Sequence, residues 1–223
     1  MKKSMYNVIL NYMFECMNDS AHDPEHIFRV LYLSLNIASK RTEKINYNVL
    51  IASCLLHDIG REEQFKNHKI CHAEIGGTMA NNFLVKNGWK KEEANHVNKC
   101  ISSHRFRGNN VPETIEAKIL FDADKIDVSG VMGISRTILY KGQTNEPLYY
   151  VNSEEQVIYE NGDSFIQEYN YKLKNIYDKF YTNRGNEIAK QRQKAAVNFY
   201  NCMLDEIETT YKQGRMNLNN ALL

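Results

Sequence analysis

Four residues carry side chains that bind divalent metal ions in proteins. They are His26, the adjacent pair His57 and Asp58 in the stretch CLLHDIG, and Asp124 in the stretch LFDADKID. Two imidazoles and two carboxylates form a mixed nitrogen and oxygen ligand set, which suits Mn, Fe, Co, Ni or Zn and suits Mg less well. Four protein ligands also leave positions on an octahedral ion open to water and to substrate oxygens, as a catalytic site requires.

The apolar periodicity predicts that these residues lie on three helices. Pro24 is typical of the first position of a helix, which places His26 near a helix start. The apolar stretch of about 47–58 ends at the His–Asp pair, and Gly60 is expected to end that helix with a left-handed residue. Adjacent residues of a regular helix diverge by about 100°, so the pair can share an ion only where the helix is ending.

The fourth ligand, Asp124, lies in the long apolar helical stretch that follows Pro112. Three packed helices can bring such positions to one point, as in metal sites inside helical bundles. Two neighbours compete with Asp124: by helical geometry Asp127 shares its face, whereas Asp122 points elsewhere. A polar helix end at 57–58 and an ordinary surface or core histidine at position 26 are the plain alternatives to metal binding.

Composition and charge exclude several classes of protein. Among the 223 residues 43% are hydrophobic, and the net charge is about +1, which gives no electrostatic reason to expect a nucleic-acid or membrane partner. The five cysteines are scattered without a C-x-x-C pair, which indicates free thiols in a reducing cytosol. No segment approaches the roughly 18 apolar residues of a spanning helix. We therefore expect a cytoplasmic protein, and homo-oligomers remain open.

The periodicity predicts an all-α protein that forms one domain over residues 1–223. Its core is expected at about 20–140, with C-terminal helices of about 164–213 packed on it and a frayed tail. A turn-rich insertion near 141–163 is expected to form a loop or lid. After an amphipathic N-terminal helix and the helix that Pro24 opens, we expect helices at about 47–58, 72–86, 92–105, a long helix after Pro112 with a break near Gly130 or Gly133, and helices at about 164–181 and 185–213.

The order of these residues resembles a known family. His26, then the HD pair at 57–58, then Asp124 resemble the H…HD…D signature of the HD-domain metal-dependent phosphohydrolases. The stretches EHIFRV, SSHRFRGNNVPETIEAKILFDADKIDVSGVMGISRT and YKLKNIYDKFYTNRGNEIAKQR look like the small bacterial branch of nucleotide-pyrophosphatase-like HD proteins. The resemblance covers nearly the whole chain from about 20 to 210. It implies an all-α HD-type helical bundle, one divalent metal ion on the four ligands, and hydrolysis of phosphate esters or anhydrides.

The resemblance also suggests a possible second ion. Many HD enzymes bind one through two further histidines between the HD pair and the last aspartate. His104 is expected in the site as a phosphate contact or as a ligand to that ion, whereas His72 is left open between a ligand and an ordinary helix-start histidine. Asp127 and His104 are the candidates to orient or deprotonate the attacking water.

Basic residues are expected to contact the phosphates of the substrate. Arg29, one turn after His26, and Lys125, beside Asp124, are the favoured contacts, followed by Arg61. Several HD hydrolases have a glutamate in the place of Arg61, three residues after the HD aspartate, so the general acid is left open.

The expected substrate is a small phosphorylated molecule such as a nucleoside triphosphate. One alternative is a hydrolase of signalling nucleotides. SSHRFRG lacks the extended signature of cyclic-dinucleotide enzymes, and Arg61 weakens the match to enzymes of the stringent-response nucleotides. A non-catalytic sensor that binds a metal or nucleotide is the other alternative, and the complete ligand set argues against it.

Overall fold

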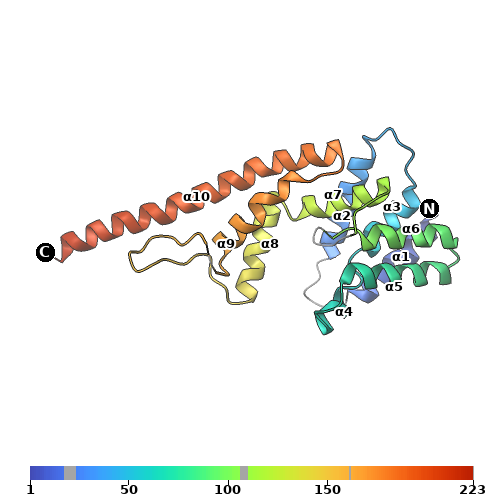
Figure 1. Ribbon diagram of the computed structural model, residues 1–223, viewed down its shortest axis with the longest axis horizontal. Helices are drawn as coiled ribbons and strands as arrows, with labels where there is room; N and C mark the ends of the chain where they lie inside the picture. The colour runs from blue at the N-terminus through green and yellow to red at the C-terminus, as the bar shows by residue number, and fades with distance from the viewer. Residues whose placement is uncertain (18–23, 106–109, 161, 223) are drawn as a thin grey trace. The chain divides into compact units, whose positions relative to one another are not determined.

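The computed structural model describes residues 1–17, 24–105, 110–160 and 162–222 (Figure 1). In this part of the chain the protein is all-α, which confirms the predicted fold class, and the one β pairing is an isolated bridge between Val151 and Val157. The chain divides into two compact units. Unit 1 comprises Met1–Asp127 with Phe180–Gly185, and unit 2 comprises Val128–Lys179 with Asn186–Leu223. The single domain stays a prediction.

Unit 1 is built around one central helix, α3 (Tyr47–Leu56). Seven of its ten residues are buried, and it contacts the other long helices of the unit. A helix that is apolar on all sides must be covered on all sides, and here the end of α3 carries His57 and Asp58 into the interior. The surrounding helices are α1 (Lys3–Cys16), α2 (Pro24–Ala38), α4 (Arg61–Lys66), α5 (His72–Lys86), α6 (Lys91–Ser102) and α7 (Ile115–Asp127).

The turn after α3 differs from its prediction. Gly60 has φ −86° and ψ 1°, so the expected left-handed conformation is wrong. Glycine is needed for close packing instead: a Cβ at Gly60 would lie 2.3 Å from the carbonyl oxygen of His72 and 2.7 Å from the amide nitrogen of Gly76. The backbone of α5 therefore starts directly against the HD turn.

Unit 2 contains α8 (Gly130–Gln143), α9 (Phe165–Tyr171), the 3₁₀ helix η1 (Leu173–Asp178) and most of α10 (Asn183–Ala221). The break before α8 falls at Gly130, where φ is 66° and the amide donates to the hydroxyl of Tyr177 at 2.9 Å. This confirms one of the two expected break points. The single helix expected at 164–181 is wrong, because Lys172 (φ −116°) separates two short helices.

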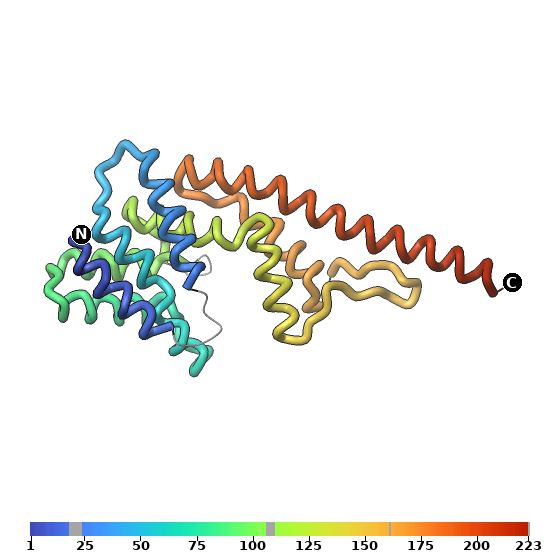
Figure 2. Tube along the Cα trace, turned by 180° about the vertical axis from the view of Figure 1, so that it is seen from behind, coloured from blue at the N-terminus to red at the C-terminus, as the bar shows by residue number. Residues whose placement is uncertain are grey.

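The C-terminal helix and the insertion pack together within unit 2. Helix α10 continues to Ala221, so the expected frayed tail is wrong. Figure 2 shows the insertion as a long loop beside α10. Its tyrosines make the contact: the ring centroids of Tyr149 and Tyr211 are 6.4 Å apart, and the hydroxyl of Tyr159 donates to Glu208.

A short segment far along the chain completes unit 1. The carboxylate of Asp122 on α7 accepts hydrogen bonds from the amides of Tyr181 and Thr182, at 2.9 and 2.7 Å, and from the Thr182 hydroxyl at 2.6 Å. Asp122 is fully buried. This aspartate therefore holds the segment 180–185 and does not compete with Asp124. None of the described helices combines the length and hydropathy needed to cross a membrane.

Candidate metal centre

Three segments of unit 1 bring the four predicted ligands together. His26 lies on the first turn of α2, His57 and Asp58 follow α3, and Asp124 lies on α7. The Nε2 atom of His26 lies 3.2 Å from Oδ1 of Asp124, 3.3 Å from Nε2 of His57 and 3.6 Å from Oδ2 of Asp58. Donor atoms about 2.1 Å from one ion are about 3.0 to 3.5 Å apart in octahedral or tetrahedral geometry. The observed spacings are close to those of a coordination shell.

A second group of donors lies on the other side of Asp58. Its Oδ1 atom lies 3.5 Å from Nε2 of His72 and 3.7 Å from Nε2 of His104, and the two histidine nitrogens are 3.4 Å apart. The structure thus has two buried His/Asp clusters that share Asp58, one oxygen facing each. His72, which the sequence left open, joins the site with His104.

The shared carboxylate is incompletely satisfied by protein groups. Arg61 pairs with Asp58, with its Nε atom 2.9 Å from Oδ1. Within the described residues, however, no donor reaches this buried oxygen with hydrogen-bond geometry. The charge of Arg61 offsets part of the cost of burying this oxygen, but the oxygen still lacks a hydrogen bond of good geometry, and that lack is unfavourable. A cation between Asp58 and the two histidines would remove that cost, so the donor set fits a metal ion.

All four imidazoles are oriented in the same way. In each ring Nδ1 contacts an oxygen and Nε2 faces Asp58. Such contacts fix both the ring orientation and the tautomer of a metal-binding histidine. The pairs are His26 with Oδ2 of Asp127 at 2.7 Å, His57 with the Cys54 carbonyl at 2.8 Å, His72 with Oε1 of Gln64 at 2.8 Å and His104 with the Ile101 carbonyl at 2.6 Å.

The protonation of the histidines differs across the site. Burial lowers the pKa of His57 to about 4 and that of His72 to about 3, so both are neutral at pH 7 and keep a lone pair for a metal. Burial acts in the same direction on His26, but its hydrogen bonds to Asp124 and Asp127 outweigh burial and raise its pKa to about 9. In the absence of a metal, His26 therefore carries the positive charge of the first cluster.

The carboxylates remain ionised despite their burial. Burial would raise the pKa of Asp124, but the hydrogen bond and charge of His26 lower it to about 2. Burial likewise opposes the ionisation of Asp58. The charges of Arg61 and the histidines nevertheless hold the pKa of Asp58 well below the usual range. The Asp124 side chain is 21% exposed, compared with 6% for Asp58. The first cluster is therefore open to solvent at Asp124.

Two further predicted site residues are buried. Asp127 is fully buried, and its carboxylate accepts hydrogen bonds from Nε and Nη2 of Arg29, at 2.7 and 3.1 Å, in addition to His26. Lys125 is also buried, with its ammonium 4.6 Å from the centre of the Phe180 ring. The third predicted phosphate contact, Arg61, pairs directly with Asp58 of the clusters.

Sequence reasoning missed the oxygen atoms that orient the histidines. Gln64 lies on α4, a six-residue polar helix that apolar periodicity could not reveal. The carbonyl oxygens of Cys54 and Ile101 lie three residues before His57 and His104. Backbone acceptors of this kind have no signal in the sequence.

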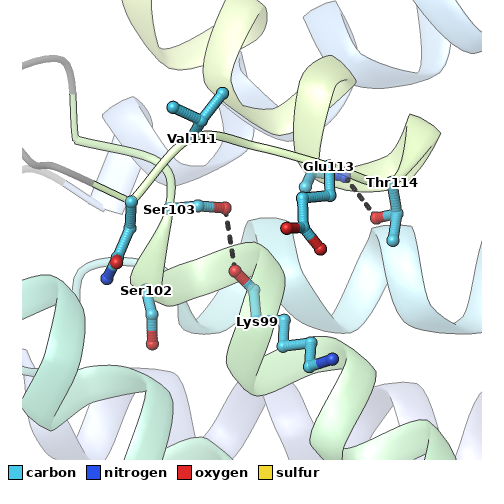
Figure 3. A pocket seen from close by; sticks show the side chains of 8 residues that line it. Lys99, Ser102, Ser103, Val111, Glu113 and Thr114 are labelled. Carbon is cyan, nitrogen blue, oxygen red and sulfur yellow. Dashed lines mark hydrogen bonds between the residues drawn. The ribbon is translucent and has the colours of Figure 1, made fainter.

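A separate cavity of about 550 Å³ lies between the end of α6 and the start of α7 (Figure 3). Figure 3 shows the hydroxyl of Ser103 donating to the carbonyl of Lys99, at 2.8 Å. The other lining residues are Ser102, Asn110, Val111, Glu113, Thr114 and Ala117. No residue of the two His/Asp clusters lines this cavity, so it is distinct from the candidate metal centre.

Comparison with known proteins decides the family. Residues 25–129, which include all the residues of both clusters, match the model of the HD domain. This part of the chain is an HD domain. The chain is similar to the uncharacterized protein YpgQ of Bacillus subtilis, with 28% identity over 184 residues, 81% of this chain and 82% of YpgQ.

Solved structures support the same assignment of the HD domain. A predicted HD superfamily hydrolase from an uncultured Thermotogales bacterium is 28% identical with a TM-score of 0.61, and the match covers 89% of this chain and 90% of that one. The Lin1889 protein of Listeria innocua is 26% identical with a TM-score of 0.69, covering 93% and 98%. The predicted recognition of the superfamily is confirmed.

Proposed function

We propose that this HD protein is a divalent-metal-dependent phosphohydrolase whose substrate is a small phosphorylated molecule, a nucleotide. One observation carries the proposal: the Nε2 atoms of four buried histidines face the two oxygens of one buried carboxylate, Asp58. Each ring is oriented by an oxygen at its other nitrogen. Burying four polar rings is unfavourable in free energy, and the binding of metal ions would offset that cost.

The residues of the first cluster would hold one ion, and Asp58 with His72 and His104 would hold a second. A bound divalent ion polarises a phosphoryl oxygen and lowers the pKa of a water molecule towards neutrality. Partial exposure of Asp124 would let the phosphate approach from that side. Because Nε2 of His104 faces Asp58, we favour a ligand role for His104 over a proton carrier.

The surrounding residues would orient the ligands and balance charge. The carboxylate of Asp127 contacts both His26 and Arg29. This favours a positioning role for Asp127 over proton transfer. It also favours a positioning role for Arg29 over direct binding of the phosphate. The Arg61 side chain is 38% exposed beside Asp58, so it would offer its charge to a phosphate. Lys125 stays a weaker candidate for phosphate binding, because adjacent residues of a helix diverge by about 100° and Lys125 therefore points away from Asp124.

Support for a nucleotide comes from the relative YpgQ, whose crystal structure in complex with ADP has been determined. That is a property of YpgQ, and it identifies nucleotides as the first compounds to test here. Nucleoside triphosphates, diphosphates and simple phosphomonoesters should each be incubated with metal-loaded protein. Assays for orthophosphate and pyrophosphate would separate monoester or terminal-phosphate cleavage from pyrophosphohydrolysis.

The decisive variants are His57→Ala and Asp124→Asn, with His68→Ala as the matched control. His68 is an exposed histidine of the same unit outside both clusters. We expect the first two variants to lose metal and hydrolysis together and the control to keep both. Fully metallated wild-type protein that cleaves none of these compounds would favour the sensor alternative. Unchanged metal content in both cluster variants would refute the assigned site.

The number of ions can be tested separately. In metal analysis, His104→Ala should lower the content from two ions to one, and Asp58→Ala should remove both because both clusters share that carboxylate. If the wild-type protein binds one ion and His104→Ala binds the same amount, the metal is restricted to the first cluster.

A further inference from the structure

Arg61 lies at the oxygen atom that a second metal ion would need. Its Nε atom is 2.9 Å from Oδ1 of Asp58. The Nε2 atoms of His72 and His104 lie 3.5 and 3.7 Å from the same oxygen. An ion bound by Asp58, His72 and His104 must coordinate this oxygen, so the ion and the guanidinium would meet at one atom.

The contact between Arg61 and Asp58 is one that Arg61 can leave. Within the described residues Oδ1 receives no hydrogen bond of good geometry, so the attraction is between charges and is not fixed by a directed bond. The Arg61 side chain is 38% exposed and the Asp58 side chain 6%, so the guanidinium can turn to solvent while the carboxylate stays buried. Glu62 and Glu63 follow Arg61 in the chain, but both pair with Lys66.

The second cluster has too little negative charge for both cations. As the described residues define it, the cluster contains one carboxylate, Asp58, which it shares with the first cluster. The first cluster also has Asp124 beside His26, and Asp127 lies behind that histidine. A divalent ion and a guanidinium at one buried carboxylate repel each other, and salt screens buried charges less than exposed ones.

We infer that Arg61 and the second ion compete for Oδ1 of Asp58, so that the ion displaces Arg61 and the displaced guanidinium binds a phosphate of the substrate. The inference rests on the proposed function, which supplies that phosphate. Loading of the second ion and binding of the phosphate would then strengthen each other, because each favours the displaced position of Arg61.

Calorimetric titration of the metal-free protein with Mn²⁺ tests the competition. In Arg61→Gln the second ion should bind about tenfold or more tightly than in the wild type, because a nearby like charge is removed. Lys66→Gln is the matched control: it removes the same charge from an exposed position of α4 and should leave both affinities unchanged. In a His104→Ala background, which lacks a ligand of the second cluster, Arg61→Gln should give no such gain.

The outcomes separate this inference from the proposed function. A second ion that binds Arg61→Gln no more tightly than it binds the wild type would overturn the competition. One bound ion in both proteins would also overturn it, yet would leave hydrolysis at the first cluster standing. A wild-type protein that binds no ion would refute the proposed function, and the inference with it.

NMR spectroscopy of the arginine Nε–H groups measures the displacement directly. The signal of Arg61 is assigned by its loss in Arg61→Gln. With Zn²⁺ as a diamagnetic ion, this signal should change chiefly as the second equivalent binds, and orthophosphate added afterwards should change it again. A signal that the second ion leaves unchanged would mean that Arg61 stays on Asp58, which contradicts the inference. A displaced Arg61 that does not respond to orthophosphate would overturn its role at the phosphate.

Discussion

Replacing Gly60 by alanine should damage the second His/Asp cluster selectively. The new Cβ would lie 2.3 Å from the carbonyl oxygen of His72, whereas ordinary contacts of a Cβ begin at 3.4 Å. The start of α5 must therefore move away by about 1.1 Å, the difference between these distances. The two shortest contacts are backbone atoms, of His72 and Gly76, so rotation of a side chain could relieve only the third contact, with Cγ2 of Ile75 at 2.8 Å.

The same displacement would move a metal-binding side chain. His72 Nε2 is 3.5 Å from Asp58 Oδ1, and a shift of 1.1 Å along this direction would lengthen the distance to about 4.6 Å. That separation is too long for two ligands of one small divalent ion. The first cluster contains no residue of α5 and should be affected less. Overpacking of this kind costs about 1–3 kcal/mol of the free energy of unfolding.

Urea denaturation of the metal-free protein would measure the loss of stability, and metal analysis would measure the ions bound. Gly142→Ala is the matched control, because no atom lies within 4 Å of a Cβ at that position of α8. Alanine in a helix is about 0.5–1 kcal/mol more favourable than glycine, so the control should be at least as stable as wild type. A Gly60→Ala protein with wild-type stability and wild-type metal content would refute the reasoning.

Three other predictions follow from buried contacts. Asp127→Asn removes the charge that orients His26, so calorimetry should show metal affinity about 10- to 100-fold lower with helix content unchanged; equal affinity would contradict this. Thr182→Val removes a donor to buried Asp122 and should lower the free energy of unfolding by about 1–3 kcal/mol in urea, whereas no loss would mean that the two amides suffice. In the metal-free protein the pKa of His26 is raised from 6.5 to about 9. Its stabilising contribution is full below pH 6.5 and lost as the pH rises through 9, and His26→Gln should not show this loss.

Much of the helical framework was predictable because long apolar periods dominate it. Helix α5 has the bounds His72–Lys86 that its pattern predicts. Apolar periodicity did not predict the short helices, because α4 and η1 contain six residues each and have too few turns to show a period. The end of α10 was missed for a different reason: its last turns are exposed, so no apolar face marks them.

The types of the candidate ligands were visible in the sequence, but their surroundings were not. His26, His57, Asp58 and Asp124 stood out by chemistry and order, and the structure brings them together. The inclusion of His72 depends on how closely α5 approaches the HD turn, which is a tertiary contact. Similarly, the burial of Asp127 behind His26 distinguishes it from Asp124, although both share one face of α7.

The hydrogen bonds of Asp122 have a consequence for synthesis of the chain on the ribosome. All other elements of unit 1 are translated by residue 127, yet the donors to this buried carboxylate are at residues 181 and 182. About fifty residues of unit 2 must be made first. Until then Asp122 has to remain hydrated or lose its charge, because a buried carboxylate without donors is strongly unfavourable. The nascent HD core should therefore stay loose around α7 until the far segment emerges, and a fragment cut at the end of the HD match should never become fully compact.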